Sequence, residues 1–546
     1  MSDTVARVLA RELTAAGVRL AFTVPGESFL PALGALEEAG VRVIATRHEG
    51  GAAFMAEAAS QLLGVPQVCL GTRAVGAANL SIGIHTARQN STPMVAIVGQ
   101  VKRAHRGREA FQEVDQVASF GRLAKAAAEI DDPRRATDLI REGLRQAMSG
   151  RPGPVLISVP EDVWALDAPA DAEVGSSRGA PPAPVPSDVA AVVELLGSAV
   201  RPAIVAGGGL LRARATEALV ELAEALAVPV VAAWRRPDVF PNDHSLYLGM
   251  TGYAAAPTVL PRLLEADALV VIGCRLSEVA AFEYRIPAEG CRWAHVDLEP
   301  RPAIAGLTSP EVAIPADAGA FLGAALSGVT VDPSGRDRRL AQAHADRRAY
   351  VEARIVDRDS WDGPGVHPGR VISTLQRLLP PDAILTTDAG NFSGWAARGY
   401  VWTHPGTFLG PTSGAMGYGL PAAIAACLVH PDRPVVALCG DGGFAMTMSE
   451  LETGVREGAR PITLVFDNGR YGTIAMHQAR EGEPSVATDL GRIDFAAVAE
   501  ASGALGLRVT TDDMLEPALR KALAADRPSV LHVALDRSWL SVDARG

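Results

Sequence analysis

Two stretches decide the fold: VVALCGDGG at residues 435–443 and, after a helical pattern over residues 444–456, ITLVFDN at residues 462–468. Each begins as an uncharged run of β-branched and aliphatic residues, which is typical of a parallel strand covered on both faces. Consecutive glycines let the backbone approach a ligand closely, and a helix start offers unpaired N–H groups to a phosphate. The stretch therefore predicts a strand–helix–strand unit with a phosphate cradle after its first strand.

Two polar residues follow these strands. Asp441 and Asn468 would lie at the same edge of the sheet, where ligands of parallel sheets bind. A carboxylate, an amide oxygen and a backbone carbonyl, with two phosphate oxygens and a water, would complete the octahedron that Mg²⁺ demands. Taken singly, GDGG is often a tight turn and Asp-Asn-Gly a common turn triplet. Their occurrence at corresponding strand ends favours a Mg²⁺ site.

Similar apolar runs recur through the chain and predict an α/β fold with three doubly wound parallel-sheet domains. They read VRVIAT, QVCLGT and MVAIVG, then RPAIVAG, ALVVIG and WAHVD, then AILTTD, PVVALCG and ITLVFD. The strand-end rule selects Glu49 and Asp388 besides the metal pair. The predicted segments are an N-terminal domain (1–165), a linker rich in Ala and Pro (166–187), a central domain (188–330), a charged connecting helix (331–364) and a C-terminal domain (365–546).

Composition excludes several classes of protein. A chain of 546 residues exceeds any single small binding module, and its net charge of −11 opposes binding to nucleic acid or to an anionic membrane. Its longest apolar run is about half of a membrane-spanning helix. The amphipathic N-terminus lacks the apolar core of a signal peptide, and five cysteines without C-x-x-C spacing suit buried thiols. We expect a cytoplasmic enzyme.

The metal motif resembles that of the thiamine diphosphate-dependent enzymes, and the resemblance along the chain is closest to the acetolactate synthase group. It implies pyrimidine-binding, Rossmann-like middle and diphosphate-binding domains in this order. It also implies that Asp441, the Asn468 side chain and the Arg470 carbonyl bind Mg²⁺, with Gly442, Gly443, Tyr471 and Gly472 beside the cofactor. One departure is Asp467, where the family commonly has a first asparagine.

Two further segments match cofactor-binding segments of that group. GAMGYGLPAAIAAC (414–427) implies that the Gly414 carbonyl and Met416 hold the aminopyrimidine, with the Met416 side chain bending the cofactor. By itself this segment could be a glycine-rich helix start with a core methionine. TTDAGNFSGW (386–395) implies phosphate contacts from Gly390, Asn391 and Phe392.

Glu49 follows the strand VIAT and precedes a helix of small residues. On residues alone it could be a helix-start charge that favours the dipole. The resemblance instead implies that Glu49 is catalytic: it reaches N1′ of an aminopyrimidine across a dimer interface and exchanges a proton with it. The implied assembly is a homodimer, or a dimer of dimers, with shared active sites. His48 is expected to pack or hydrogen-bond locally.

Three departures from the group bear on the substrate. Pro25-Gly26-Glu27-Ser28 replaces Pro-Gly-Gly-Ala and adds a carboxylate, Thr72-Arg73-Ala74-Val75-Gly76 alters the wall near the aminopyrimidine, and His477 replaces a tryptophan. These changes predict a more acidic pocket and a polar or hydroxylated acceptor. The predicted substrate-binding residues are Gly26, Glu27, Ser28, Phe111, Gln112, Met476 and His477. For Phe111 and Gln112 the alternative is the start of an ordinary amphipathic helix.

The leading hypothesis is a thiamine diphosphate- and Mg²⁺-dependent enzyme that decarboxylates a 2-oxo acid and transfers the acyl carbanion equivalent to a second carbonyl. A non-ligating decarboxylase or C–C lyase with the same cofactor stays open. A flavin- or nucleotide-binding oxidoreductase leaves Asp441, Asn468 and Glu49 without a joint role, and no G-x-G-x-x-G follows a strand. Glycines at 207–209 and 249–252 are compatible with FAD, which is not favoured because a middle domain needs such turns anyway.

Overall fold

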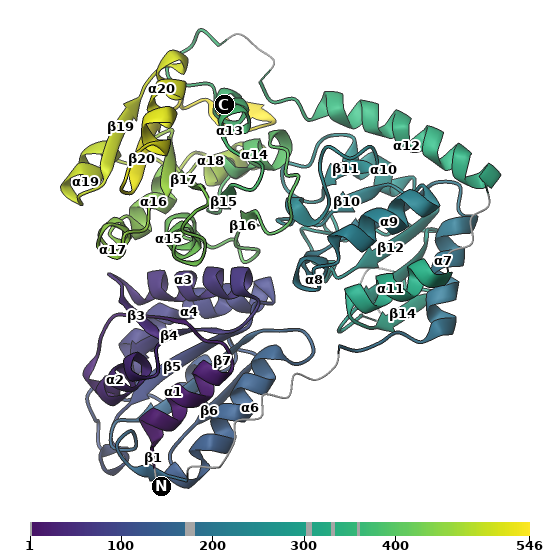
Figure 1. Ribbon diagram of the computed structural model, residues 1–546. Coiled ribbons are helices and arrows are strands. Elements are labelled where there is room, and N and C mark those ends of the chain that lie inside the picture. The colour runs from purple at the N-terminus through teal and green to yellow at the C-terminus, as the bar shows by residue number, and fades with distance from the viewer. Residues whose placement is uncertain (1–2, 170–180, 302–307, 329–332, 358–360, 546) are drawn as a thin grey trace.

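The computed structural model describes residues 3–169, 181–301, 308–328, 333–357 and 361–545, and it contains three six-stranded sheets in which every pair of neighbouring strands is parallel (Figure 1). All nine apolar runs quoted above contain strands of these sheets. The predicted fold of three doubly wound domains is confirmed.

The N-terminal sheet has the strand order β3-β2-β4-β5-β7-β6. Helices α1, α2 and α6 pack on one face, and α3 and α4 cover the other, which faces the C-terminal domain (Figure 1). The strands are β2 (Leu20–Thr23), β3 (Arg42–Ala45), β4 (Gln67–Thr72), β5 (Met94–Gln100), β6 (Ala126–Glu129) and β7 (Pro154–Pro160). The helices are α1 (Val5–Ala15), α2 (Leu30–Glu38), α3 (Glu49–Leu63), α4 (Arg73–Asn90), α5 (Gln116–Phe120) and α6 (Ala136–Met148).

The middle sheet has the order β11-β10-β9-β12-β13-β14. Its strands are β9 (Pro202–Ala206), β10 (Val230–Ala232), β11 (Tyr247–Met250), β12 (Ala268–Ile272), β13 (Arg292–Asp297) and β14 (Val312–Pro315). Its helices are α7 (Pro186–Ser198), α8 (Gly208–Arg212), α9 (Thr216–Leu226), α10 (Val259–Leu264) and α11 (Ala318–Gly328). The following α12 (Pro333–Ala353) lies along this domain, where Asp346 accepts a 2.6 Å hydrogen bond from Arg262.

The C-terminal sheet has the order β16-β15-β17-β18-β20-β19. Its strands are β15 (Ile384–Thr387), β16 (Phe408–Leu409), β17 (Val435–Gly440), β18 (Ile462–Asp467), β19 (Leu505–Val509) and β20 (Ser529–Ala534). Its helices are α13 (Pro368–Leu378), α14 (Ser393–Gly399), α15 (Gly419–Val429), α16 (Asp441–Thr447), α17 (Glu450–Glu457), α18 (Gly472–Glu481), α19 (Phe495–Ala501) and α20 (Asp512–Leu523). A hairpin of β21 (Trp539–Ser541) and β22 (Ala544–Arg545) follows.

The helix predicted over residues 444–456 is two helices, α16 and α17. At the junction Leu451 N donates to Met448 O and Glu452 N to Ser449 O, so the chain tightens locally into bonds three residues apart. The Thr447 hydroxyl also donates to the Gly417 carbonyl, 2.9 Å away. The break lets Glu450 begin a second helix.

The segments predicted as linkers have structure of their own where they are described. In the segment 166–187, β8 (Asp167–Ala168) pairs antiparallel with β1 (Asp3–Thr4), and α7 begins at residue 186. Residues 170–180 of that segment lie outside the described residues. The charged segment 331–364 contains α12, whereas residues 329–332 and 358–360 are not described.

The N- and C-terminal domains share one hydrophobic core through α3 and α15 (Figure 1). At its centre the rings of Phe54 and Tyr418 pack edge to face with centroids 5.4 Å apart. Both helices consist largely of small residues, which lets their backbones approach closely. All five cysteines are buried free thiols, as predicted. Among the described helices, none is long and apolar enough to cross a membrane.

Candidate active site

Asp441 is the first residue of α16, directly after β17. Its Oδ1 accepts a hydrogen bond from Gly442 N at 2.7 Å and its Oδ2 one from Gly469 N at 2.8 Å. Because β17 and β18 are parallel neighbours with Gly440 opposite Phe466, the turn after β18 lies beside Asp441. The structure thus brings the two predicted metal-binding segments together.

The Asn468 amide is held in one orientation. Its Nδ2 donates to the Trp539 carbonyl at 3.2 Å, and its Oδ1 accepts from Arg470 N at 3.3 Å. The Arg470 carbonyl accepts from Gly472 N at 2.8 Å and keeps a second lone pair. No group of three or more His, Cys, Asp or Glu side chains suited to a metal occurs in the described part of the chain. The donors gathered here are a carboxylate, an amide and a carbonyl, which suit Mg²⁺.

The charge at this site is unbalanced. Burial and, next, the neighbouring Asp467 carboxyl raise the pKa of Asp441 to about 7. Burial also acts on Asp467, but the 2.7 Å hydrogen bond from His532 and the pairing with Asp441 lower the pKa of Asp467 overall. Two carboxyls share one partly buried space, so a bound cation would relieve their repulsion.

The glycines beside Asp441 leave no room for side chains. A Cβ on Gly442 would lie 2.5 Å from the Tyr471 ring, and one on Gly443 would lie 2.4 Å from Asp388 Oδ2. Asp388 is fully buried, accepts from Gly419 N at 2.6 Å and so caps α15. Among the described residues its Oδ2 has no hydrogen-bond partner, and burial raises the pKa of Asp388 to about 6. Packing against Tyr471 and Asp388 therefore requires glycine at both positions.

The second predicted phosphate loop meets α18. Asn391 Nδ2 donates to the Leu540 carbonyl at 2.9 Å and lies 3.4 Å from Met476 Sδ. Phe392 stacks on Phe466 with centroids 5.5 Å apart, and Gly390 adopts a positive φ of 149°. The structure therefore places predicted phosphate-binding and substrate-binding residues side by side.

The predicted aminopyrimidine-binding segment precedes α15. Gly414 is exposed and has a φ of 73°, and Met416 is half-buried. The Ala415 carbonyl accepts from Ala389 N at 3.3 Å, which ties this segment to the loop after β15. Gly414, Met416 and the cradle glycines thus belong to one face of the C-terminal domain, at the carboxyl ends of its strands.

Glu49 is the first residue of α3, and only 7% of it is exposed. Its Oε2 accepts from Asn79 Nδ2 at 2.9 Å, and its Oε1 lies next to Gly76. His48 caps the helix: its Nδ1 accepts from Gly50 N at 2.9 Å, a local role as expected. Within the described residues no hydrogen bond joins Glu49 to Asp441 or Asn468 of the same chain.

The substrate-side residues of the N-terminal domain cluster around Arg73. The Arg73 guanidinium lies 3.0 Å from both Glu27 and Glu161, and it sits 5.9 Å from the centre of the Phe111 ring. The negative charge of Glu27 is therefore paired with the positive charge of Arg73. The prediction of a more acidic pocket considered Glu27 without this partner. Phe111 is 71% exposed and belongs to a turn before α5, not to a helix start.

The other predicted substrate-binding residues lie in two places: Gly26, Ser28 and Gln112 in the N-terminal domain, and Met476 and His477 on α18 of the C-terminal domain. Gln112 has a positive φ of 62°, and its carbonyl accepts from Ala74 N. Ser28 is fully buried, with its Oγ 2.7 Å from Thr72 Oγ1, and a Cβ on Gly26 would clash with Thr72. On α18 Met476 is buried, whereas His477 is exposed in the single chain. The two groups of predicted residues belong to different domains.

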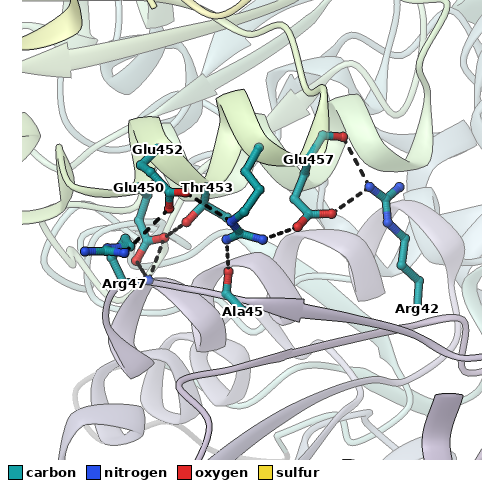
Figure 2. A network of polar contacts seen from close by, with 8 residues as sticks. Arg42, Ala45, Arg47, Glu450, Glu452, Thr453 and Glu457 are labelled. Atoms are coloured by element: carbon teal, nitrogen blue, oxygen red, sulfur yellow. Dashed lines mark hydrogen bonds and ion pairs between the residues drawn. The ribbon is translucent and has the colours of Figure 1, made fainter. Parts of the chain in front are cut away.

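Glu450 is a residue of this region that the sequence analysis missed (Figure 2). It is fully buried at the start of α17 and accepts hydrogen bonds from the backbone next to Glu49. Burial raises the pKa of Glu450, and hydrogen bonds from Thr453 and the backbone oppose that rise. A charged residue on the buried face of an amphipathic helix, one turn before Gly454, is the sequence signal for it.

The middle domain contains a cavity of about 870 Å³. Its lining includes the glycines 207–209 together with Arg236, Arg275 and Asp297. Arg236 and Arg275 also donate to residues at the end of α4, and Phe408 and Thr412 line the cavity as well, so it lies where the middle domain meets the N- and C-terminal domains. Its volume suits a ligand of nucleotide size.

Comparisons with known proteins agree with this geometry. Family models of the thiamine pyrophosphate enzyme match its N-terminal TPP binding domain to residues 3–119, its central domain to 189–325 and its C-terminal TPP binding domain to 388–533. The probable acetolactate synthase large subunit of Methanocaldococcus jannaschii is 30% identical, with 97% of this chain and 92% of the relative covered. The chain belongs to the thiamine pyrophosphate enzyme family.

Other relatives fit the same assignment. The acetolactate synthase isozyme 2 large subunit of Escherichia coli is 31% identical over 96% of this chain and 94% of its own. The putative thiamine pyrophosphate-containing protein YdaP of Bacillus subtilis is 30% identical over 95% and 89%. The predicted family is confirmed, and the protein is a thiamine diphosphate (thiamine pyrophosphate) enzyme.

Proposed function

We propose that this enzyme decarboxylates a 2-oxo acid and transfers the resulting acyl carbanion equivalent to a second carbonyl, with thiamine diphosphate and Mg²⁺ as cofactors. The observation that carries the proposal is the pairing of Asp441 with the Asn468 turn beside a bare glycine cradle. Similarity to acetolactate synthase large subunits over nearly the whole chain supports the transfer step.

The donors after β17 and β18 fit the cofactor. Asp441, the Asn468 amide oxygen and the Arg470 carbonyl would hold Mg²⁺, and Gly442 and Gly443 would admit the diphosphate. Bound thiamine diphosphate supplies the carbanion stabilisation that decarboxylation needs. The Gly414 carbonyl and Met416 would orient the aminopyrimidine, and Glu49 would hold and move a proton at its N1′.

A direct assay tests the function. The purified protein, with thiamine diphosphate and Mg²⁺, is incubated with a panel of 2-oxo acids, with and without aldehyde and 2-oxo acid acceptors. The proposal expects carbon dioxide release together with a coupled product. Release of carbon dioxide with free aldehyde in every acceptor assay would instead identify a non-ligating decarboxylase.

The metal assignment predicts a binding defect. Asp441→Ala removes a charged ligand, so Mg²⁺-dependent cofactor affinity should fall by about 100-fold or more, because loss of even an outer-shell partner can cost that much. Isothermal titration with thiamine diphosphate at fixed Mg²⁺ measures it. Asp432→Ala, an exposed change near the opposite end of β17, is the matched control. Equal affinity of Asp441→Ala and its control would refute the metal site.

We infer that two copies of the chain form each active site. In the part of the chain that the structure describes, no hydrogen bond connects Glu49 with Asp441, although the proposed chemistry places both at one cofactor. Apolar side chains on the elements that carry the site are about half exposed, as expected of surfaces that a second copy covers. They are Val75 (48%), Ile82 (43%), Met446 (53%) and Ile474 (51%).

Shared sites predict complementation between inactive variants. Glu49→Gln and Asp441→Ala each spoil both sites of their own homodimer, but a mixed dimer has one site with neither change. Mixing the two proteins under conditions of subunit exchange should restore activity, and each mixed dimer should have about half the activity of a wild-type dimer because one of its two sites is intact. Full activity in a species that sedimentation shows to be a monomer would contradict the arrangement.

We propose a polar or hydroxylated acceptor. His477 on α18 offers an imidazole where the related synthases are expected to have a tryptophan, and Glu27 with Arg73 adds charged groups on the N-terminal domain. A site that hydrogen-bonds a substrate hydroxyl rejects analogues lacking it far more strongly than an apolar pocket discriminates one methylene.

His477→Trp should therefore lower turnover with a polar acceptor and raise turnover with pyruvate as acceptor. We expect the ratio of the two turnovers to fall by about tenfold, the effect of one hydrogen bond or a small apolar contact. Ala479→Trp, at an exposed position of the same helix, controls for added bulk. An unchanged ratio would remove His477 from the specificity argument.

We also infer that the middle-domain cavity does not hold a flavin. The glycine turns at 207–209 serve the packing of the sheet, since a Cβ on Gly207 would lie 2.3 Å from the Gly273 carbonyl oxygen. The Arg236 side chain packs directly over Gly208, with its Nε 2.7 Å from the position of a Cβ there. The purified protein should lack the visible absorbance of an oxidised flavin.

A further inference from the structure

Glu450 brings a charge from the C-terminal domain into the segment that presents Glu49. Its Oε1 accepts from His48 N at 3.0 Å and from Arg47 N at 3.1 Å, and its Oε2 lies 3.2 Å from Arg47 N. Thr453 Oγ1 donates to Oε2 at 2.6 Å. Both carboxylate oxygens are occupied, and none of the side chain is exposed.

Within the described residues, the backbone N–H groups of Arg47 and His48 donate to no acceptor other than Glu450. His48 is the N-cap of α3 and Arg47 precedes it, so their N–H groups lie outside the helical hydrogen-bond ladder. The Glu450 carboxylate supplies the acceptor for both N–H groups, so this backbone conformation depends on it. Glu49 is the next residue, and the direction of its side chain follows from that backbone.

Gly51 packs directly against the Glu450 carboxylate. A Cβ at this position would lie 2.4 Å from Glu450 Oε1 and 2.9 Å from its Cδ. The second glycine of the Glu49-Gly50-Gly51 sequence is therefore required by the carboxylate of another domain. The first turn of α3 is built around Glu450.

The ion pairs around Glu450 are more exposed to solvent than the Glu450 carboxylate itself. Arg42 lies 2.7 Å from Glu457 and Arg47 3.9 Å from Glu452, but both arginines are about half exposed (Figure 2). Exposed ion pairs of this kind contribute little to the stability of a protein. Figure 2 shows the acidic side chains of α17 directed toward the segment before α3, and Glu450 alone among the acids drawn there is fully buried.

We propose that Glu450 is a positioning residue for Glu49: it fixes the backbone of Arg47 and His48 and thereby the approach of the Glu49 carboxyl to the cofactor. The proposal rests on the proposed role of Glu49. Glu450 itself does not touch the reacting atoms. Its carboxylate acts through geometry, so a side chain that keeps the acceptor oxygen should preserve the function.

The test measures hydrogen exchange at C2 of bound thiamine diphosphate in deuterated water, together with cofactor affinity and thermal unfolding. Glu450→Ala should slow the exchange by about 10- to 100-fold, because misplacement near 1 Å has effects of that size. Glu450→Gln retains an oxygen for both backbone donors and should stay within about threefold of the wild type. Glu457→Ala, which removes the neighbouring exposed ion pair, is the matched control and should exchange normally.

A second variant covers the case in which Glu450→Ala does not fold. Gly51→Ala leaves the carboxylate in place but pushes it away from the Arg47 and His48 donors, and it should also slow the exchange. Wild-type exchange in both Glu450→Ala and Gly51→Ala, or in whichever of them folds, overturns the proposal. A fall in Glu450→Gln as large as in Glu450→Ala overturns it as well, since charge and not position would then matter.

Glu49→Gln separates this proposal from the function on which it rests. Slow exchange in Glu49→Gln with wild-type exchange in Glu450→Ala rejects the positioning role alone. Wild-type exchange in Glu49→Gln rejects the role of Glu49 and the positioning role together. Slow exchange in Glu49→Gln, Glu450→Ala and Gly51→Ala, with normal exchange in Glu457→Ala, supports both.

Discussion

The contact between α3 and α15 is the constraint on which the rest of the molecule depends. Small side chains on both helices let the backbones approach until the N- and C-terminal domains share one apolar core. Glu57 is buried in that contact, where Tyr418 Oη, Asn90 Nδ2 and Thr92 Oγ1 donate to it at 2.6–2.9 Å. A buried carboxylate that lost these donors would be costly, so the domains dock in one orientation.

The fixed orientation of the two domains determines where Glu49 and Asp441 lie relative to the N- and C-terminal sheets. The start of α3 presents Glu49 from one domain, and the cradle with Asp441 ends a strand of the other. Asn79 of its own domain holds the Glu49 carboxyl, and Gly469 of the other domain holds that of Asp441. The backbone before Glu49 is held in addition by Glu450 of the C-terminal domain, so the local geometry of Glu49 depends on the docking of the two domains.

Much of this arrangement could be predicted from local sequence. Asp441 and Asn468 follow two apolar strands that are separated by a short helical stretch, and parallel pairing brings such strand ends together. Arg73 and Glu450 could not be placed in this way. Arg73 depends on Glu161, 88 residues away, and Glu450 on Arg47, 403 residues away. Such contacts depend on how the layers and domains dock against one another. Local sequence patterns do not predict this docking.

The break between α16 and α17 connects two features of the structure: the GDGG motif at Asp441, and the contact between Glu450 and the N-terminal domain. A single straight helix from Asp441 would continue in one direction, but the tightened turn at Met448 and Ser449 sets a new start at Glu450. One short stretch of chain thus begins with Asp441, the carboxylate of the proposed metal site, and continues to Glu450, the carboxylate that contacts the N-terminal domain at the start of the second helix.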